Sequence, residues 1–574
     1  MDTQRLILFF VFSFSLLMLW ESWQKENRPA TLVVAQNTTS SVPSPAPVAG
    51  VSGSAAVTPM PSTGLSTPRP DAVPGAVVVG SPITALTGRE RVRVRTDVLA
   101  AEIDSQGGDL VFLEFLNQKD IIDPKKNLIL LSPEHQYAVQ SGLIGPNLPN
   151  HRTLFATSAK EVVLADGQES FEQKLEAVTP DGIKVIKTYI FHRGSHLIEI
   201  RQDIVNGSAK PLSSHAYFQI TRDGNAPPGD SAMMQTYTGA AAFTDQEKFL
   251  KVAFSDIEKG KATFPKTPDN GWVAIIQHYF TTALVPSQKQ REVYMRKLDG
   301  NLFAVGVILP LPILAPGATT SISVPLYSGP NDQDKLKSIA PGLELVVDYG
   351  WLTVIAAPLF WVLQHFYSLV GNWGVAIILL TLGLKLLFYP LSAASYRSMA
   401  KMKLVAPRLT KLREQYGDDR MKLNQAMMEM YKQEKINPLG GCLPIVVQIP
   451  VFISLYWVLL SSVELRHASW LWIHDLAAPD AGFFTIPGIN MPVGVLPIAM
   501  MISMVFQTKL NPTPPDPVQA KVMMIMPFVF GVMFFFFPAG LVLYWLVNNV
   551  LSIAQQWQIT RMVEGARKPV VAKR

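Results

Sequence analysis

The 574-residue chain has one cysteine, Cys442, and few charged residues: Asp, Glu, Lys and Arg make up 16% of it, while 48% is hydrophobic. A single cysteine excludes an intrachain disulfide framework. The low charge content and the positive mean hydropathy of +0.21 exclude an ordinary soluble protein. No Gly-rich loop ends in Gly-Lys-Ser/Thr, and the histidines show no metal-ligand spacing. We therefore expect no nucleotide fuel, metal or cofactor.

Long apolar runs are confined to residues after about 349 and predict membrane spans. The connection between the last two of these spans is so short that they must form an antiparallel hairpin. None contains Asp, Glu or His, and no internal repeat is visible, which disfavours an intramembrane enzyme and an ion-coupled transporter. The predicted spans are about 373–391, 443–463, 491–509, 522–538 and 540–559.

Lys385 is the only charge in the apolar run from Trp373 to Leu391. A charge near the middle of a membrane helix costs about 2.5–3.5 kcal/mol on insertion scales, so function is the default expectation. The alternative is snorkelling, in which the amine reaches the nearer membrane surface. Thr381 lies on the same helical face, and further polar side chains occur in the other spans: Gln448, Ser503, Gln507, Asn548 and Asn549. They predict either a wet cavity or simple hydrogen bonding between helices.

The part of the chain before the spans divides into three regions. Leu6–Trp20 is apolar, and no small-residue cleavage site follows it, so residues 1–28 predict an uncleaved membrane anchor rather than a signal peptide. Residues 29–88 are rich in Pro, Ser, Thr and Ala and predict a disordered linker. Residues 89–345 alternate polar and apolar side chains, as in Arg91–Thr96, between turn signals such as Gly107-Gly108; they predict an all-β sandwich.

Charge placement predicts the topology. Residues 392–437 hold ten Lys or Arg against five acidic residues, and the tail 563–574 is also basic, so the positive-inside rule places both in the cytoplasm. The loop 464–490 has Arg466 as its one Lys or Arg and is expected outside. Five spans after residue 373 satisfy these assignments. The apolar segment 346–372 is then expected to lie on the outer membrane surface as an interfacial helix. The clustering of cations beside spans favours lipid contact over nucleic-acid recognition.

The cytoplasmic segment predicts a helical hairpin. Apolar residues repeat at three- and four-residue spacing on both sides of a break at Gly417-Asp418-Asp419. Met402, Met427 and Met430 lie in this apolar seam. The seam is either internal packing or an adaptable surface that receives apolar clients.

Several motifs occur in an order that resembles one protein family. They are Tyr389-Pro-Leu after the lone cation, Gly417-Asp-Asp, Lys435-Ile-Asn-Pro-Leu-Gly-Gly-Cys-Leu-Pro, Glu464-Leu-Arg, Trp472-Ile-His-Asp-Leu and Pro538-Ala-Gly-Leu-Val-Leu-Tyr. With the N-terminal anchor and the large β domain, the chain resembles the YidC-type membrane protein insertases, in their Gram-negative form.

The resemblance implies a periplasmic β-supersandwich and a five-helix core at 373–562 that is not an enzyme. It implies a function: inserting and folding membrane proteins in the bacterial inner membrane, alone or with the Sec translocon. The implied groove is hydrophilic and open to lipid; its expected residues are Lys385, Thr381, Gln448, Phe452, Ser503, Gln507, Tyr544, Trp545 and Asn548.

The partners implied are nascent membrane proteins, Sec translocon subunits, the ribosome through the basic tail and hairpin, and membrane lipids. Both termini are expected in the cytoplasm. Many relatives carry arginine where this chain has Lys385, which favours a mechanism that needs only positive potential. A lipid scramblase or a holding chaperone is the alternative.

Overall fold

The computed structural model describes residues 89–565 apart from 121–122, 124, 158, 228–235, 418, 435–442, 481–483, 487–490 and 512–516. The expected anchor, the whole linker and most of the basic tail therefore lie outside the described residues. The chain divides into two units. Both large sheets and all described helices except the first part of α10 belong to the larger one, which holds Pro68–Pro512 and Pro527–Arg574.

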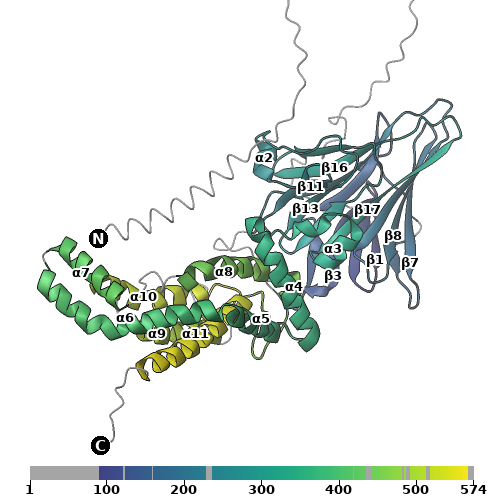
Figure 1. Ribbon diagram of the computed structural model, residues 1–574. Helices are drawn as coiled ribbons and strands as arrows, with labels where there is room; N and C mark the ends of the chain where they lie inside the picture. The colour runs from purple at the N-terminus through teal and green to yellow at the C-terminus, as the bar shows by residue number, and fades with distance from the viewer. Residues whose placement is uncertain are drawn as a thin grey trace, which may run out of the picture. The chain divides into compact units, whose positions relative to one another are not determined.

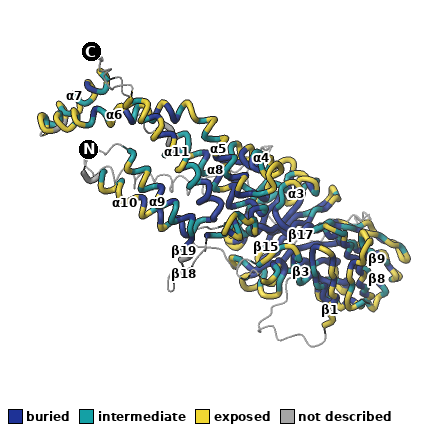
Figure 2. Tube along the Cα trace, turned by 90° about the horizontal axis from the view of Figure 1, so that it is seen from below, coloured by how far each residue is buried: buried dark blue, intermediate teal, exposed yellow. Residues whose placement is uncertain are grey.

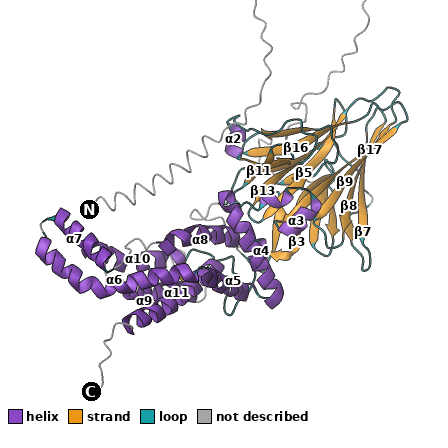
Figure 3. Cartoon of the chain, viewed as in Figure 1, coloured by secondary structure: helices purple, strands orange, loops and turns teal. Residues whose placement is uncertain are grey.

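Two large sheets make up the region before residue 331, which confirms the predicted β-sandwich (Figures 1 and 3). The first sheet has the strand order β15-β16-β10-β5-β3-β2-β1-β6, and β4 pairs with β3. Its neighbours are antiparallel except for the parallel pair β1–β6. Its strands are β1 (Arg91–Arg95), β2 (Leu99–Asp104), β3 (Asp109–Lys119), β4 (Asn127–Leu131), β5 (Ala138–Ile144), β6 (Glu161–Val163), β10 (His215–Asp223), β15 (Glu292–Lys297) and β16 (Leu302–Pro310).

The second sheet has the order β12-β11-β13-β14-β17-β9-β8-β7, and all its pairs are antiparallel. Alternation in the sequence fixes which side of each strand faces inward; β9 alternates intermediate and buried residues along its whole length. Its strands are β7 (Ser170–Val178), β8 (Ile183–His192), β9 (Leu197–Asn206), β11 (Gly239–Thr244), β12 (Lys248–Val252), β13 (Trp272–Gln277), β14 (Phe280–Leu284) and β17 (Thr319–Pro330).

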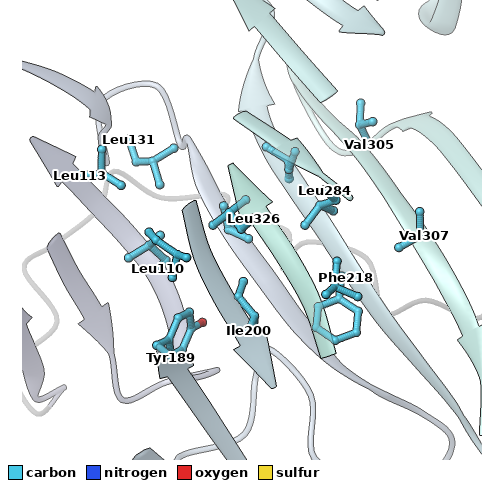
Figure 4. Close-up of a cluster of buried hydrophobic side chains, with 14 of the residues drawn as sticks. Leu110, Leu113, Leu131, Tyr189, Ile200, Phe218, Leu284, Val305, Val307 and Leu326 are labelled. Carbon is cyan, nitrogen blue, oxygen red and sulfur yellow. The ribbon is translucent and has the colours of Figure 1, made fainter. Parts of the chain in front are cut away.

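The core of this β domain lies between the sheets. Figure 4 shows Leu110 and Phe218 of the first sheet near Ile200 and Leu326 of the second, and all four are fully buried. Phe115 of β3 stacks on Phe280 of β14 with ring centroids 5.1 Å apart. Burial of apolar area at about 25 cal/mol per Å² is the main stabilising contribution.

A buried charged pair interrupts this apolar core. Lys187 of β8 is 0% exposed, and its Nζ lies 3.7 Å from Asp109 Oδ1 of β3. Nζ also donates hydrogen bonds to the carbonyls of Ser141 (2.6 Å) and Gly107 and lies 4.8 Å from the centroid of the Phe155 ring. Burial raises the pKa of Asp109 and lowers that of Lys187, while their mutual attraction opposes both shifts. The pair therefore ties the two sheets together at a site where either partner alone would be costly.

The region after residue 331 is helical apart from a small hairpin of β18 (Phe484–Ile486) and β19 (Met491–Val493). α11 packs against α5, α6, α8 and α9, and α4 packs against α5 and α8. The helices are α2 (Phe254–Glu258, within the β domain), α3 (Gln333–Ile339), α4 (Thr353–Val370), α5 (Trp373–Leu387), α6 (Tyr389–Tyr416), α7 (Arg420–Gln433), α8 (Leu443–Ser461), α9 (Val495–Leu510), α10 (Pro517–Phe534) and α11 (Ala539–Gly565), with 3₁₀ turns η2 (Leu343–Val346), η3 (Gly350–Leu352) and η5 (Val463–Leu465).

Helix lengths test the predicted spans only in part. Among the described residues, the one unbroken helix that is long and apolar enough to cross a membrane is Gly350–Val370. This is the segment that the charge distribution places on the membrane surface, and its interfacial position stays a prediction. α5 and α6 pass the same test jointly, as a pair bent by 67°. Apolar stretches of 447–461, 495–510 and 520–534 are shorter.

At two of the predicted spans the helix bounds differ from those of the span. The span 373–391 is not one straight helix, because α5 ends at Leu387 and α6 begins at Tyr389, followed by Pro390. Proline disfavours helical geometry in the residue before it, which accounts for a break at this point. Within the predicted span 491–509, residues 491–493 form β19, and α9 starts after Gly494.

α6 and α7 form the helical hairpin that the sequence predicts at 392–437, although α6 begins three residues earlier (Figure 1). Asp419 caps α7, since its carboxylate accepts hydrogen bonds from the backbone N–H groups of Met421 and Lys422. An ion pair of 2.7 Å between Arg408 and Glu434 joins the two helices. The helix breaks at the motif, as predicted, and the structure adds that Asp419 caps the second helix.

Candidate functional site

Lys385, the lone cation of α5, reaches α11. Its Nζ donates a hydrogen bond of 2.7 Å to Ser552 Oγ, and that hydroxyl donates to the carbonyl of Asn548 one turn earlier. Ser552 is 4% exposed. The Ser552 hydroxyl is neutral, and the predicted spans contain no Asp or Glu. The positive charge of Lys385 is therefore not compensated by a negative charge within the spans.

A second polar contact joins α8 to α11. Gln448 Nε2 donates a hydrogen bond of 2.8 Å to the hydroxyl of Tyr544. One turn along α8, Phe452 stacks on Trp545 with ring centroids 4.3 Å apart, and Phe534 meets the same indole edge-on. Four of the predicted groove residues therefore belong to one contact surface between α8 and α11.

A third contact joins α9 to α11. Asn549 Nδ2 donates a hydrogen bond of 2.8 Å to Ser503 Oγ, and both residues are buried. Hydrogen bonding between helices describes this pair better than a water-lined surface does, because each side chain is the hydrogen-bond partner of the other.

The remaining predicted residues are less clearly placed in one site. Thr381 is 1% exposed and donates to the carbonyl of Ile377 in its own helix. Asn548 contributes its backbone carbonyl to Ser552, and Gln507 contributes its carbonyl to Asn511. The structure thus brings the predicted residues together pairwise along α11 rather than in one ring.

The sequence reasoning missed part of this arrangement. Ser552 is the partner of Lys385, and Gln556 donates to Asn511 at the end of α9. A signal for both was present: Tyr544, Asn548, Ser552 and Gln556 recur every four residues and so share one face of α11.

The hairpin methionines lie mostly in its seam. Met430 is 8% exposed and packs with Val405, while Met402 packs against that pair. Met430 would therefore contact a client only if α6 and α7 separated. Of the two interpretations of the seam, internal packing fits the position of Met430. Met427 is partly buried. The most exposed methionines of α7 are Met421 (80%) and Met428 (55%), on a helix that is largely exposed outside the seam (Figure 2).

A further contact surface joins the end of α8 to the β domain within the larger unit. Val463 of η5 belongs to the β-domain core, and Arg466 Nη2 donates to the carbonyl of Lys119 at 2.8 Å. The Arg466 guanidinium also lies over the rings of Tyr279 and Phe280. The Glu464 side chain is buried between these contacts, and neither of its oxygens has a hydrogen-bond partner among the described residues. Burial raises its pKa from 4.5 to about 7.

Comparison with known proteins connects these observations. Two family models match the chain: the YidC periplasmic domain at residues 91–362 and the 60Kd inner membrane protein at residues 365–567. A curated relative from Dechloromonas aromatica, a membrane protein insertase YidC, is 54% identical over 99% of both chains. The chain belongs to the YidC membrane protein insertase family. This confirms the resemblance seen in the motifs.

A further relative and a solved structure are also similar to the chain. The Aromatoleum aromaticum protein of the same name is 52% identical over 99% of both chains. A crystal structure of an active YidC insertase, with its first transmembrane domain resolved, is 17% identical, covers 81% of this chain and 94% of its own, and has a TM-score of 0.36. The YidC family consists of inner membrane proteins that act as insertases rather than as enzymes, as the sequence predicted.

Proposed function

We propose that this chain inserts and folds integral membrane proteins in the inner membrane, alone or with the Sec translocon, through a hydrophilic groove that is open to lipid. The observation that carries the proposal is the contact of Lys385 with Ser552. It places a positive charge between α5, whose other side chains are apolar except for Thr381, and the polar face of α11.

The Lys385 charge lowers the energy of an acidic or polar client segment as that segment enters the membrane. A hydroxyl partner holds the amine in place without neutralising it, so the positive potential stays available. The client's own apolar helix then moves sideways into lipid, driven by about 25 cal/mol for each Å² of apolar area removed from water. Nothing in this sequence of events needs a nucleotide.

The contacts along α11 supply the rest of the groove wall. Gln448 with Tyr544, and Phe452 with Trp545, offer a polar and an aromatic surface on the α8 side. Gln507 and Asn548 extend this wall. Behind it, Ser503 holds α9 against α11 through its hydrogen bond with Asn549, and Thr381 lies buried in α5.

The proposed topology has an N-terminal anchor at 1–28, a linker at 29–88, the β domain in the periplasm and five spans in the core. Both termini and the α6–α7 hairpin lie in the cytoplasm, where α7 receives clients through its exposed Met421 and Met428, and through the seam only when α6 and α7 separate. The basic hairpin and tail make weak contact with the ribosome.

Reconstitution of the purified chain in lipid vesicles with a small phage-coat-like client tests the proposal. We expect the client to become protected from external protease in a membrane-spanning form, without a nucleotide. Release of labelled lipid to the opposite leaflet without client insertion would identify a scramblase. Client that stays soluble but uninserted would identify a holding chaperone. Either result overturns the insertase proposal.

A further inference from the structure

A tight turn at Trp470–Ile473 exposes two large apolar side chains. Trp470 and Ile473 exchange two backbone hydrogen bonds of 2.9 Å, which makes Leu471 and Trp472 the tip of the turn. Leu471 is 73% exposed and Trp472 is 41% exposed. Leu471 also has a φ of 51°, a left-handed conformation that leucine rarely adopts. A turn exposed to water usually carries glycine or asparagine at such a position, so exposure to water does not account for the leucine.

The turn is fixed to the first residues of α5. The Trp470 ring lies on Gly374, where an added Cβ would come within 2.2 Å of Trp470 Cγ. Asn372, which caps α5, donates to the carbonyl of Ser469 at 3.2 Å. Ile473 and Leu476 are buried, and Leu476 accepts a hydrogen bond from Gly540 at the start of α11. The exposed tip is therefore held rigidly beside the ends of two helices.

The chemistry of the segment matches a bilayer interface rather than water. From His467 to His474 the chain has no Asp, Glu, Lys or Arg. Tyr367 of α4 stacks on Trp373 at 4.1 Å, which adds two aromatic rings at the same end of α5. Trp and Tyr gather where membrane helices meet the headgroups.

The helix to which the turn is fixed also exposes an apolar surface of its own. Val375, Leu382 and Leu386 of α5 are 36%, 41% and 66% exposed, and their spacing places them on one helical face. Gly374, where Trp470 packs, precedes this stripe by one residue and points roughly 100° around the helix from it. The helix that the turn contacts therefore exposes apolar side chains suited to lipid on a neighbouring face.

We propose that the tip formed by Leu471 and Trp472 inserts into the outer leaflet of the bilayer and sets the depth of α5. The inference rests on the proposed topology, in which Trp373 marks the outer end of α5. Lys385 follows Trp373 by twelve residues, about 18 Å along a helix, which places it about 3 Å past the middle of a hydrocarbon core of roughly 30 Å. The turn thereby holds the groove cation near the membrane centre.

The test is depth-dependent fluorescence quenching in reconstituted vesicles. The Cys442→Ser, Leu471→Cys chain carries an NBD label in vesicles of phosphatidylethanolamine and phosphatidylglycerol that contain nitroxide lipids. We expect the NBD emission to lie at a shorter wavelength than that of the free label in buffer. We also expect a nitroxide at shallow depth to quench it strongly and iodide to quench it little. A Trp472→Cys label provides a second site should the first variant misfold. A label at Val178, an exposed apolar residue of β7, is the matched control and should respond only to iodide.

Iodide quenching at both tip sites, with no effect of nitroxide lipids, would overturn the proposal. So would protection that appears only after another protein is added, which would make the tip a protein-docking surface. Insertion assays separate this inference from the proposed function. Trp472→Ser should lower client insertion, whereas Val178→Ser should not, and unchanged insertion by Trp472→Ser would refute the depth-setting role. Failure of the unmodified chain to insert a client would instead refute the insertase proposal.

Discussion

The β domain and the helical region differ in what they expose. In the β domain, large exposed apolar side chains occur singly on different strands and loops, as at Ile129, Leu154 and Val178. In the helical region they form continuous surfaces on several helices; examples are Leu382, Leu386, Ile449, Ile502, Phe506, Val529, Val532 and Val550. Scattered apolar residues are normal on a protein in water, whereas contiguous ones mark contact with lipid or a partner.

The two regions also differ in how they bury polar groups. The β domain places a charged pair, Lys187 and Asp109, inside an otherwise apolar core. Between α5, α9 and α11, the helical region buries hydroxyl and amide groups that pair across helices, such as Ser503 with Asn549, and holds the Lys385 amine on a neutral partner. A charge that is paired stabilises one packed arrangement, while an unpaired charge remains available to a client. The difference indicates a structural role for the first site and a functional role for the second.

The largest effect is expected from removing one partner of the buried pair. Lys187→Met leaves Asp109 buried without its cation and should destabilise the β domain by roughly 3–5 kcal/mol. Lys184→Met on the same strand removes an exposed ion pair with Glu176 and should cost about 0–1 kcal/mol. Hydrogen exchange of β3 and β8, followed by mass spectrometry, measures both. Equal exchange in the two variants would show that the buried pair contributes no more than a surface one.

A smaller effect tests which solvent surrounds each region. Val529 of α10 is 57% exposed and Val178 of β7 is 59% exposed, so the two are matched in accessibility. Val529→Asp should hinder membrane insertion by about 2.5–3.5 kcal/mol, whereas Val178→Asp should change stability by no more than about 0.5 kcal/mol. Alkaline extraction of membranes and the amount of protein recovered report the result. If both variants integrate equally well, α10 does not face lipid.

The smallest effect concerns pH at the contact between α8 and the β domain. The pKa of Glu464 is raised to about 7, mainly by burial and to a smaller extent by Asp332 and Asp334, while Lys335 opposes the shift. The folded state thus binds the proton more tightly than the unfolded state, whose pKa is about 4.5. Proton binding to Glu464 therefore stabilises the folded state fully below pH 4.5, and this stabilisation is lost as the pH rises through about 7.

Glu464→Gln mimics the protonated form at every pH. At pH 8 the variant should unfold at a higher temperature than the parent chain, and at pH 4.5 the two should be close. Thermal unfolding in detergent, followed by tryptophan fluorescence, compares them. The same difference in unfolding temperature at both pH values would mean that Glu464 does not titrate in this range.

The sequence predicted those features that depend on local patterns. Alternation located β1, β8 and β9, because one buried and one exposed face per strand imposes a period of two. The motif at Gly417–Asp419 located the hairpin break, because helix capping is local. The break after Leu387 was missed although Pro390 signalled it, since a long apolar run was taken as one helix.

The contacts of the candidate site depend on how distant helices cross. Ser552 lies 167 residues from Lys385, and no periodicity within α5 indicates which face of α11 it meets. The docking of Val463 and Arg466 on the β domain likewise joins segments that composition had separated at residue 345. Such pairings follow from tertiary packing, which single-sequence patterns do not encode.

Client insertion by variants of Lys385 tests the central claim most directly. A unit charge roughly 10 Å away, at an effective dielectric constant near 20, contributes about 1.7 kcal/mol, which corresponds to more than about tenfold in rate. In reconstituted vesicles with a client that carries an acidic outer tail, Lys385→Arg and Ser552→Ala should retain most insertion, because both keep the charge. Lys385→Met should lose about tenfold and Lys385→Glu more. Equal insertion by the Lys385→Glu and Lys385→Arg variants would contradict the account.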